Sequence, residues 1–275
     1  MNIDTAAKTH ECGALEEMIE KHQYPENSII ICDRGYEKYN LMACCIEKNQ
    51  KFIIRVKDIH SNGILSTMHL DDTAFDTHIT KRVTYLQTNE TKDNELYTIL
   101  VNESAPFDYL PADHDWYEMN VRAVRFKITE DTYECLLTNL AEDEMSFDEF
   151  KEIYHLRWGI ETSFRDLKYT VGLLYFHSSD QKLIRQEIYT SLTLFNFSRI
   201  IVNNSTPVQK AEWKWHYKVN FKTAVTNIRL YLDGKINEEE LEKRIKKFLT
   251  PIRPERKYSR NVKSQSCKTP SYYAA

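Results

Sequence analysis

The sequence predicts an α/β fold with a β-rich segment and a helical C-terminal part. Two short apolar runs, Ser28–Cys32 and Lys51–Val56, have the length of strands, and helical patterns over residues 5–22 and 36–48 precede them. Helix–strand–helix–strand order is typical of a layered domain with a partly parallel sheet. The continuous apolar character of the first run predicts a strand that is buried on both faces.

Short alternating segments follow this core and predict an antiparallel β insertion before the middle of the chain. The segments are residues 81–86, 96–101, 120–128 and 133–138. We therefore expect four parts: a core at 1–57, the β insertion at 58–140, helices at 141–250, and a flexible basic tail at 251–275.

The longest helical pattern begins near Ser146, where Glu149 completes a capping-box signal. At about 100° per residue, a single helix from this point places one polar stripe within an arc of roughly 60° beside an apolar stripe. The stripe consists of Tyr154, Arg157, Glu161 and Lys168.

Three further helices are predicted at 180–203, 224–232 and from 237. The first is apolar nearly all round, so we expect it to be buried. Residues 213–221 alternate aromatic and polar side chains, which fits a half-buried segment or a platform that stacks on unpaired bases.

The charge of the 275-residue chain is divided unevenly, although its net charge is only −4. Residues 1–150 contain 14 Lys and Arg against 29 Asp and Glu, whereas residues 151–275 contain 23 against 12. This polarity indicates a polyanion, such as nucleic acid, as the partner of the second half. Alternatively, each half is solvated by its own charges and the two halves attract each other.

Other classes of protein are disfavoured by what the sequence lacks. No apolar run is long enough for a membrane span, and the N-terminus has no secretory pattern, so we expect a cytoplasmic protein. The six Cys include no Cys-x2-Cys pair, and the nine His show no metal-ligand spacing. Neither a zinc module nor a disulfide framework is therefore predicted.

The polar stripe combines groups that suit a site for phosphate and a divalent cation. The alternative is a solvated helix, because Arg157 and Glu161 also form an ordinary i,i+4 pair. Asp33 ends the first predicted strand, where open α/β sheets expose ligand-binding groups. It could instead cap the helix that follows.

These residues resemble the DDE transposases of the RNase H-like superfamily. The spacing Tyr-x2-Arg-x3-Glu-x6-Lys over residues 154–168 matches the signature of the insertion-sequence family four group. The run Ile31–Tyr36 is similar to that group's second-Asp motif. The resemblance covers essentially the whole chain.

The resemblance implies metal-dependent phosphoryl transfer on DNA with two Mg²⁺ (or Mn²⁺) ions. Asp33 and Glu161 are then the catalytic metal ligands. The residues implied to bind DNA phosphates or nearby DNA are Tyr154, Arg157, Lys168, Arg34 and Trp158. Implied partners are the transposon ends, the target DNA and a second copy of the chain in a synaptic homodimer, associated with the nucleoid.

One departure from the family pattern affects the expected activity. The family's first catalytic Asp lies on a strand that precedes the opening helix, whereas this sequence begins at that helix. We therefore expect an incomplete RNase H-like core in a truncated chain that is inactive alone. The alternatives are a non-catalytic DNA-binding or dimerising fragment that inhibits an intact transposase, and a plain α/β protein whose charged stripe is a salt-bridge network.

Overall fold

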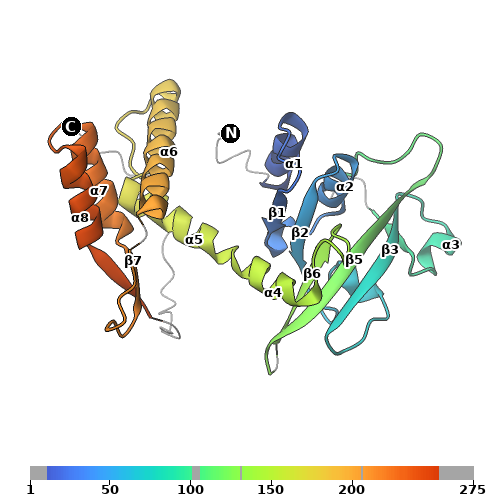
Figure 1. Cartoon of the computed structure of the whole chain (residues 1–275). Coiled ribbons are helices and arrows are strands. Elements are labelled where there is room, and N and C mark those ends of the chain that lie inside the picture. Colours follow the sequence, from blue (N-terminus) through green and yellow to red (C-terminus); the bar gives the residue numbers. More distant parts are fainter. Residues whose placement is uncertain (1–10, 101–105, 131, 206, 254–275) are drawn as a thin grey trace, which may run out of the picture. The chain divides into compact units, whose positions relative to one another are not determined.

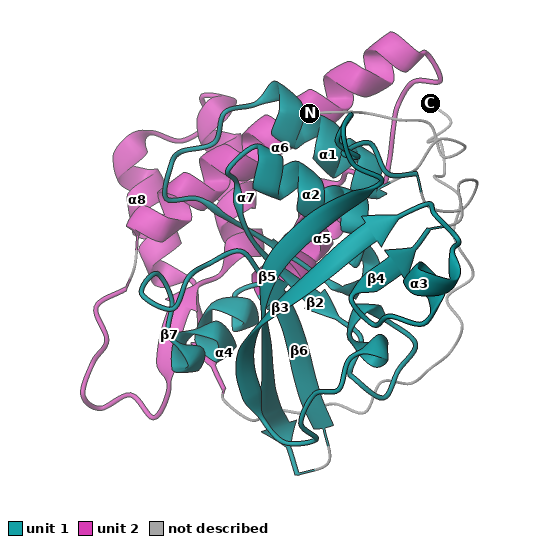
Figure 2. Ribbon diagram, turned by 90° about the vertical axis from the view of Figure 1, so that its right-hand side faces the viewer, with its two compact units in different colours: residues 1–158 teal, residues 159–275 magenta. Residues whose placement is uncertain are grey.

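The computed structural model describes residues 11–100, 106–130, 132–205 and 207–253. Contacts along the chain divide it into two compact units, residues 1–158 (unit 1) and 159–275 (unit 2), which Figure 2 colours separately. Each unit is described below by itself. None of the helices in the described ranges is long and apolar enough to cross a membrane.

Unit 1 contains a six-stranded mixed sheet in the order β1-β2-β6-β5-β3-β4. The strands are β1 (Ile29–Cys32), β2 (Lys51–Val56), β3 (Phe75–Thr84), β4 (Tyr97–Ile99), β5 (Trp116–Thr129) and β6 (Thr132–Thr138). β1 and β2 are parallel, as the α/β pattern predicted, and β2, β6, β5 and β3 pair antiparallel to one another. The mixed α/β class is thus confirmed.

Helices cover both faces of this sheet (Figure 1). On one face, α1 (Glu11–Lys21) and α2 (Tyr39–Glu47) pack over a large cluster that includes Ile19, Leu41 and Phe52. On the other face, α4 (Phe147–His155) packs over a smaller cluster that includes Ile53 and Phe150. The short helices of this unit are η2 (Arg34–Tyr36), η3 (Ile64–Thr67) and α3 (Asn89–Lys92).

Two expectations for the strands are wrong in part. β4 pairs parallel with β3, so the segment from 58 to 140 is not wholly antiparallel, and its strands extend the same sheet as β1 and β2. β1 is not buried on both faces, since Ile29, Ile30 and Ile31 are half-buried and only Cys32 is buried. The reason is that β1 lies at the edge of the sheet, where β2 is its neighbour on one side.

The helix predicted from Ser146 begins as expected but is not continuous. The Glu149 carboxylate accepts hydrogen bonds from the Ser146 backbone N–H at 2.8 Å and from its hydroxyl at 2.6 Å. α4 then ends in a tight turn, because the Leu156 and Arg157 N–H groups bond to carbonyls three residues back. The chain continues as α5 (Trp158–Arg165) and as a π-helical segment, η4 (Asp166–Val171), so the predicted single helix is divided into three segments.

Unit 2 consists of α5, η4, three further helices and a two-stranded ribbon. The elements are α6 (Gln181–Asn204), β7 (His216–Val219), α7 (Phe221–Leu232), α8 (Glu238–Lys247) and β8 (Leu249–Ile252), with β7 antiparallel to β8. The ambiguous aromatic segment is thus partly a strand. Asn237 caps α8 through a hydrogen bond to the Glu240 N–H, as its acidic start suggested.

Two expectations for unit 2 need correction. α6 is not buried all round, because Phe195 and Ser198 are its buried residues while Tyr189 and Ile200 are at least half exposed. The tail predicted from Pro251 starts later, since Pro251 and Ile252 belong to β8. Pro tolerates the edge of a two-stranded ribbon, where its missing N–H need not pair. Residues 254–275 of the predicted tail lie outside the described part of the chain.

Candidate active site

Asp33 lies just beyond the carboxyl end of β1 and is exposed. Its backbone is extended, and its Oδ1 accepts a hydrogen bond of 2.8 Å from the Gly35 N–H, which caps η2. The capping alternative is therefore correct as local structure. It uses one carboxylate oxygen, and the other forms no hydrogen bond to the described residues.

The pleat of the sheet determines which charged residues share the α4 face with Asp33. Ile29 and Ile31 of β1, Ile53 of β2 and Leu136 of β6 contact the α4 cluster, whereas their sequence neighbours contact the opposite cluster. Side chains two residues apart point the same way. The α4 face therefore also receives the charged residues that follow in the same alternation, which are Asp33, Arg55 and Glu134.

Arg55 and Glu134 form an ion pair between β2 and β6, with 2.9 Å between Arg55 Nε and Glu134 Oε1. The two side chains are 37% and 13% exposed, so the carboxylate is largely withdrawn from water. The sequence interpretation did not single out either residue. Arg55 could have been noticed, because it is a charged residue inside the apolar run Phe52–Val56. Its partner Glu134 could not, because their contact depends on the pairing of two strands about 80 residues apart.

Tyr154, in the last turn of α4, lies beside these charged groups within unit 1. Its side chain is buried, and burial raises the pKa of its hydroxyl. Four nearby charges modify this pKa: Arg157 and Arg55 lower it, and Glu134 and Asp33 raise it. The last turn of α4 and the end of β1 therefore contribute to one site, although 121 residues separate Asp33 from Tyr154 in the sequence.

The Tyr154 hydroxyl is a buried polar atom without a hydrogen-bond partner among the described residues. A buried hydroxyl left unpaired costs roughly 1–3 kcal/mol of stability. Its raised pKa keeps it protonated at neutral pH, so it is available as a donor. The buried, unpaired Tyr154 hydroxyl is therefore suited to donate a hydrogen bond to a bound ligand.

We expect Tyr154→Phe to leave the free energy of unfolding unchanged or to raise it by up to roughly 1–3 kcal/mol, because it removes an unpaired buried hydroxyl. Denaturant titration followed by circular dichroism measures the change. The matched control is Tyr39→Phe in the same unit, which removes the hydrogen bond of 3.1 Å to the Thr98 hydroxyl and should destabilise. Equal destabilisation by both substitutions would show that the Tyr154 hydroxyl has a partner in the free protein.

Arg157 and Trp158 follow α4 directly. The Arg157 Cζ lies 5.6 Å from the centre of the Tyr154 ring and 5.4 Å from that of the Trp158 ring. Both distances are within the range of cation–π contacts. Trp158 is half exposed.

Arg34 is exposed at a cavity of about 380 Å³ beyond the carboxyl ends of β1 and β2, which Lys38 and Lys57 also line. The Glu37 carboxylate accepts hydrogen bonds from the backbone N–H groups of Lys57 at 2.9 Å and Ile64 at 2.8 Å. The lining thus has three cations against this one acid, so the cavity has an excess of positive charge.

Glu161 and Lys168 are exposed residues of unit 2, on α5 and η4 respectively. The structure thus brings Asp33, Tyr154 and Arg157 together in unit 1 and places the other two signature residues in unit 2. A shared site for Asp33 and Glu161 joins residues of different units and stays a prediction.

The donor chemistry at Asp33 fits a hard divalent cation, because Mg²⁺ prefers carboxylate oxygens. A single carboxylate, however, supplies too few ligands for a metal centre. Across the described ranges, no group of three or more His, Cys, Asp and Glu side chains is arranged to hold a metal ion. A two-ion centre therefore requires further carboxylates in addition to Asp33.

The mixed α/β sheet has an exposed acid and several cations beyond its parallel strands, which is where open α/β domains commonly bind their ligands. The family model described as "Transposase DDE domain" matches residues 1–197. This range is more than half of the chain, and the chain belongs to the DDE transposase domain family. Members of this family in general cleave and transfer DNA strands with divalent metal ions. No curated protein matches the chain.

Proposed function

We propose that the chain carries the strand-cleavage and strand-transfer site of a transposase that acts on transposon ends. The family match supports DNA transposition as the process. The observation that carries the proposal is the convergence in unit 1 of an exposed Asp33 with the unpaired hydroxyl of Tyr154. A carboxylate for a cation beside a donor for an anion is what phosphoryl transfer requires.

In this proposal Asp33 and Glu161 are the catalytic metal ligands, and two Mg²⁺ or Mn²⁺ ions would activate water or a 3′-hydroxyl and stabilise the leaving oxygen. The Tyr154 hydroxyl donates to a phosphate oxygen, and Arg157 binds the same group through its planar fork. The remaining proposed DNA contacts are Lys168, Arg34 and Trp158. Arg55 keeps Glu134 neutralised beside this site.

The finer assignments belong to the same proposal. They are membership of the insertion-sequence family four group, an RNase H-like core, and the division at residues 57, 140 and 250. A synaptic homodimer and a nucleoid-associated place in the cytoplasm follow from the proposed substrate. The Tyr-x2-Arg-x3-Glu-x6-Lys spacing supports the subgroup, and the parallel pair β1–β2 with Asp33 at its carboxyl end supports the core.

A second candidate function is a DNA-binding or dimerising fragment that inhibits an intact transposase by occupying its DNA ends. The observation that favours it is the small number of acids at the site. The described part of unit 1 supplies Asp33, with Glu134 already held by Arg55. A chain that binds DNA ends without cutting them would block the complete enzyme.

The proposed site is tested by Mn²⁺ binding in the presence of linear DNA that carries candidate transposon ends. We expect Asp33→Asn and Glu161→Gln each to weaken Mn²⁺ binding by at least about tenfold, because each removes a charged oxygen ligand. Paramagnetic resonance of free Mn²⁺ measures the change. The control is Asp113→Asn, an exposed acid of unit 1 in another segment. Unchanged Mn²⁺ binding in both site variants would overturn the proposed metal ligands.

With the same linear DNA we expect no strand cleavage by this chain with either Mg²⁺ or Mn²⁺. Two carboxylates supply too little negative charge to hold two cations close together. Gel analysis of end-labelled DNA measures cleavage. Robust cleavage that Asp33→Asn or Glu161→Gln abolishes would confirm the site and refute the predicted inactivity, and the first residue to test as a further ligand would then be Glu134.

A further inference from the structure

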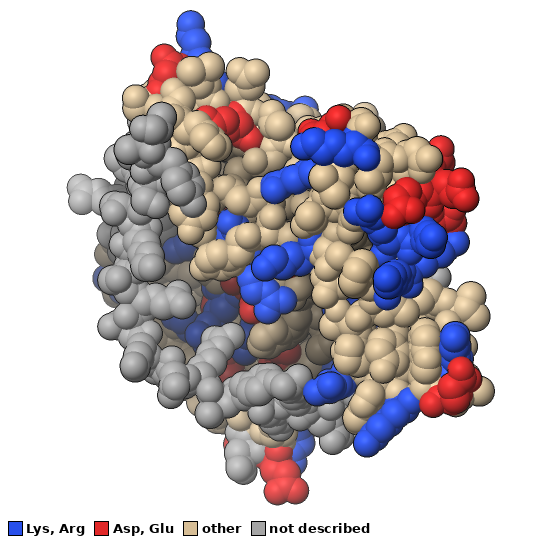
Figure 3. Space-filling model, turned by 90° about the vertical axis from the view of Figure 1, so that its left-hand side faces the viewer, with Lys and Arg blue, Asp and Glu red and all other residues tan. Residues whose placement is uncertain are grey.

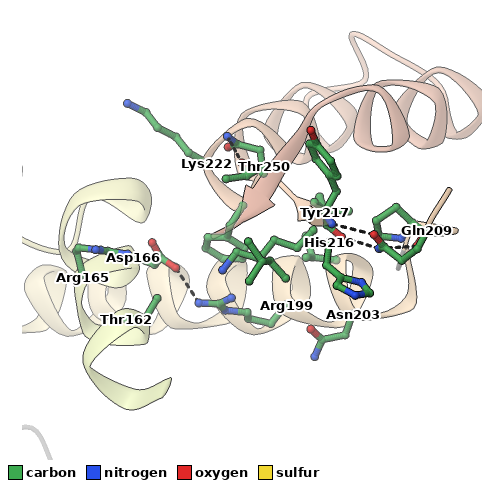
Figure 4. A pocket seen from close by; sticks show the side chains of 17 residues that line it. Thr162, Arg165, Asp166, Arg199, Asn203, Gln209, His216, Tyr217, Lys222 and Thr250 are labelled. Carbon is green, nitrogen blue, oxygen red and sulfur yellow. Dashed lines mark hydrogen bonds and ion pairs between the residues drawn. The ribbon is translucent and has the colours of Figure 1, made fainter. Parts of the chain in front are cut away.

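A second cavity lies wholly within unit 2 and has a volume of about 800 Å³ (Figure 4). We call it the β7 pocket, since one wall is the β7–β8 ribbon. Helix α6 and the segment from α5 into η4 supply the other walls. Ligand-binding cavities commonly have volumes of about 300–1,000 Å³, so the β7 pocket is large enough for one or two nucleotides.

The register of the ribbon explains which side chains face the pocket. His216 pairs with Ile252 and Lys218 pairs with Thr250, so these four side chains lie on one face of the ribbon. All four line the pocket. His216 and Lys218 of the alternating segment thus line this cavity, together with Tyr217 and Val219, an arrangement that the sequence alone left open.

The acid in the pocket is already neutralised. Arg199 Nη2 lies 2.7 Å from Asp166 Oδ2, and the Arg199 Cζ lies 4.0 Å from the centre of the Phe221 ring. Figure 4 shows Arg199 pointing at Asp166 across the pocket. The pair is partly buried, with side chains 30% and 16% exposed. This ion pair joins α6 to η4 in the wall of the pocket and contributes no net charge to it.

Three other cations of the pocket have no such partner. Arg165 of α5, Lys218 of β7 and Lys222 of α7 are exposed, and the side chain of none of them forms a hydrogen bond or ion pair with a described residue. By contrast, Lys235 and Lys246 of the same unit pair with Asp233 and Glu242. The pocket therefore has a positive excess that an anion can neutralise.

The pocket also has an apolar side, formed by Val202, Pro207 and Ile252. Cations beside an apolar wall match a sugar–phosphate backbone, whose phosphates are anionic and whose sugars are less polar. Arg165 is one helical turn beyond Glu161 on α5, and residues four apart lie on the same side of a helix. A strand that enters the pocket therefore runs beside the helix that carries the proposed metal ligand Glu161.

We infer that the β7 pocket binds the backbone of a DNA strand, with Arg165 and Lys218 contacting its phosphates. The inference rests on the proposed function, because it takes DNA as the substrate. It adds DNA contacts by residues that are not among the four signature residues Tyr154, Arg157, Glu161 and Lys168. Lys and Arg side chains occur in several groups on the face that Figure 3 shows, with Asp and Glu side chains among them, so overall charge alone does not select this pocket.

The test compares two double variants of the full chain that remove the same charge. Arg165→Gln with Lys218→Gln removes two of the three unpaired cations of the pocket, and Lys235→Gln with Lys246→Gln removes two paired cations elsewhere in unit 2. Fluorescence anisotropy with a labelled linear duplex gives the affinity between 50 and 200 mM NaCl. Circular dichroism verifies that both variants are folded.

We expect the pocket variant to bind at least about tenfold more weakly, with a slope of log affinity against log salt that is smaller by about 1.8, which is about 0.9 for each phosphate no longer neutralised. The control variant should keep nearly the wild-type slope. Steep wild-type binding with the same change in both variants would overturn the pocket while leaving the proposed function intact. No DNA binding by the wild type would overturn both.

Discussion

Arg122→Met is expected to destabilise unit 1 by roughly 3–5 kcal/mol, a large part of the stability of a typical domain. The Arg122 side chain is 2% exposed in the middle of β5. Its Nε and Nη2 contact the two carboxylate oxygens of Asp76 at 2.6 and 2.5 Å, and its Nη1 donates to the carbonyls of Ala141 at 3.1 Å and Met145 at 2.7 Å. Methionine fills similar space but leaves all four acceptors without their donor.

The effect should extend to the candidate site, because Ala141 and Met145 belong to the segment that leads into α4. The Arg122 Cζ also lies 5.0 Å from the centre of the Phe150 ring on α4, so its removal frees the helix that carries Tyr154. The midpoint of urea unfolding measures the change. Arg82→Met is the control, because Arg82 pairs with Glu118 across the neighbouring strands with side chains that are 31% and 43% exposed. A change no larger than that of Arg82→Met would show that the Arg122 network does not hold the sheet to α4.

Local patterns in the sequence were sufficient to predict the order of elements in unit 1. The apolar run at Ile29–Cys32 and the run at Lys51–Val56 became a parallel pair, and the capping box at Ser146 starts α4. Each of these signals lies within a few residues of the structure that it specifies. The capping role of Asp33 is local in the same sense, since its partner is the Gly35 N–H.

Features that depend on pairing between distant segments could not be predicted in this way. The Arg55–Glu134 pair requires β2 and β6 to be neighbours, and the parallel partner of β3 is β4 across an intervening helix. The expected burial of β1 failed for the same reason, because an apolar run does not reveal whether its strand lies at an edge. The proximity of Tyr154 to Asp33 also depends on how α4 packs on the sheet.

The polar stripe could not be predicted for a different reason. An arc of one helix face requires a single straight α-helix, whereas the chain turns at Leu156 and Arg157 and changes to π-helix at Asp166. π-helical segments within helices occur often at functional sites, and this one contains Lys168. Tyr154, Arg157, Glu161 and Lys168 therefore match a spacing in sequence without forming one stripe on one helix.

The DNA affinity of the full chain is expected to fall by roughly 10³-fold or more between 50 and 200 mM salt, as for proteins that contact about six to ten phosphates. Residues 159–275 contain 21 Lys and Arg against 11 Asp and Glu, and the last 22 residues contain five of these cations against one acid. Each phosphate that a Lys or Arg neutralises releases counterions, so the slope reports how many phosphates are bound. Anisotropy titrations with a labelled duplex at several salt concentrations measure it.

Replacing the five cations of residues 254–275 by Gln should reduce this slope by up to about 4.5 units, which is about 0.9 for each phosphate that a cation no longer neutralises. The substituted residues are Arg256, Lys257, Arg260, Lys263 and Lys268. Because β8 ends at Ile252, these changes leave the ribbon and the β7 pocket intact. The control replaces five exposed lysines of unit 1, which are Lys21, Lys48, Lys92, Lys127 and Lys151. It changes the net charge equally, so if the slope falls by the same amount in both variants, the binding follows total charge and the tail binds no phosphates of its own.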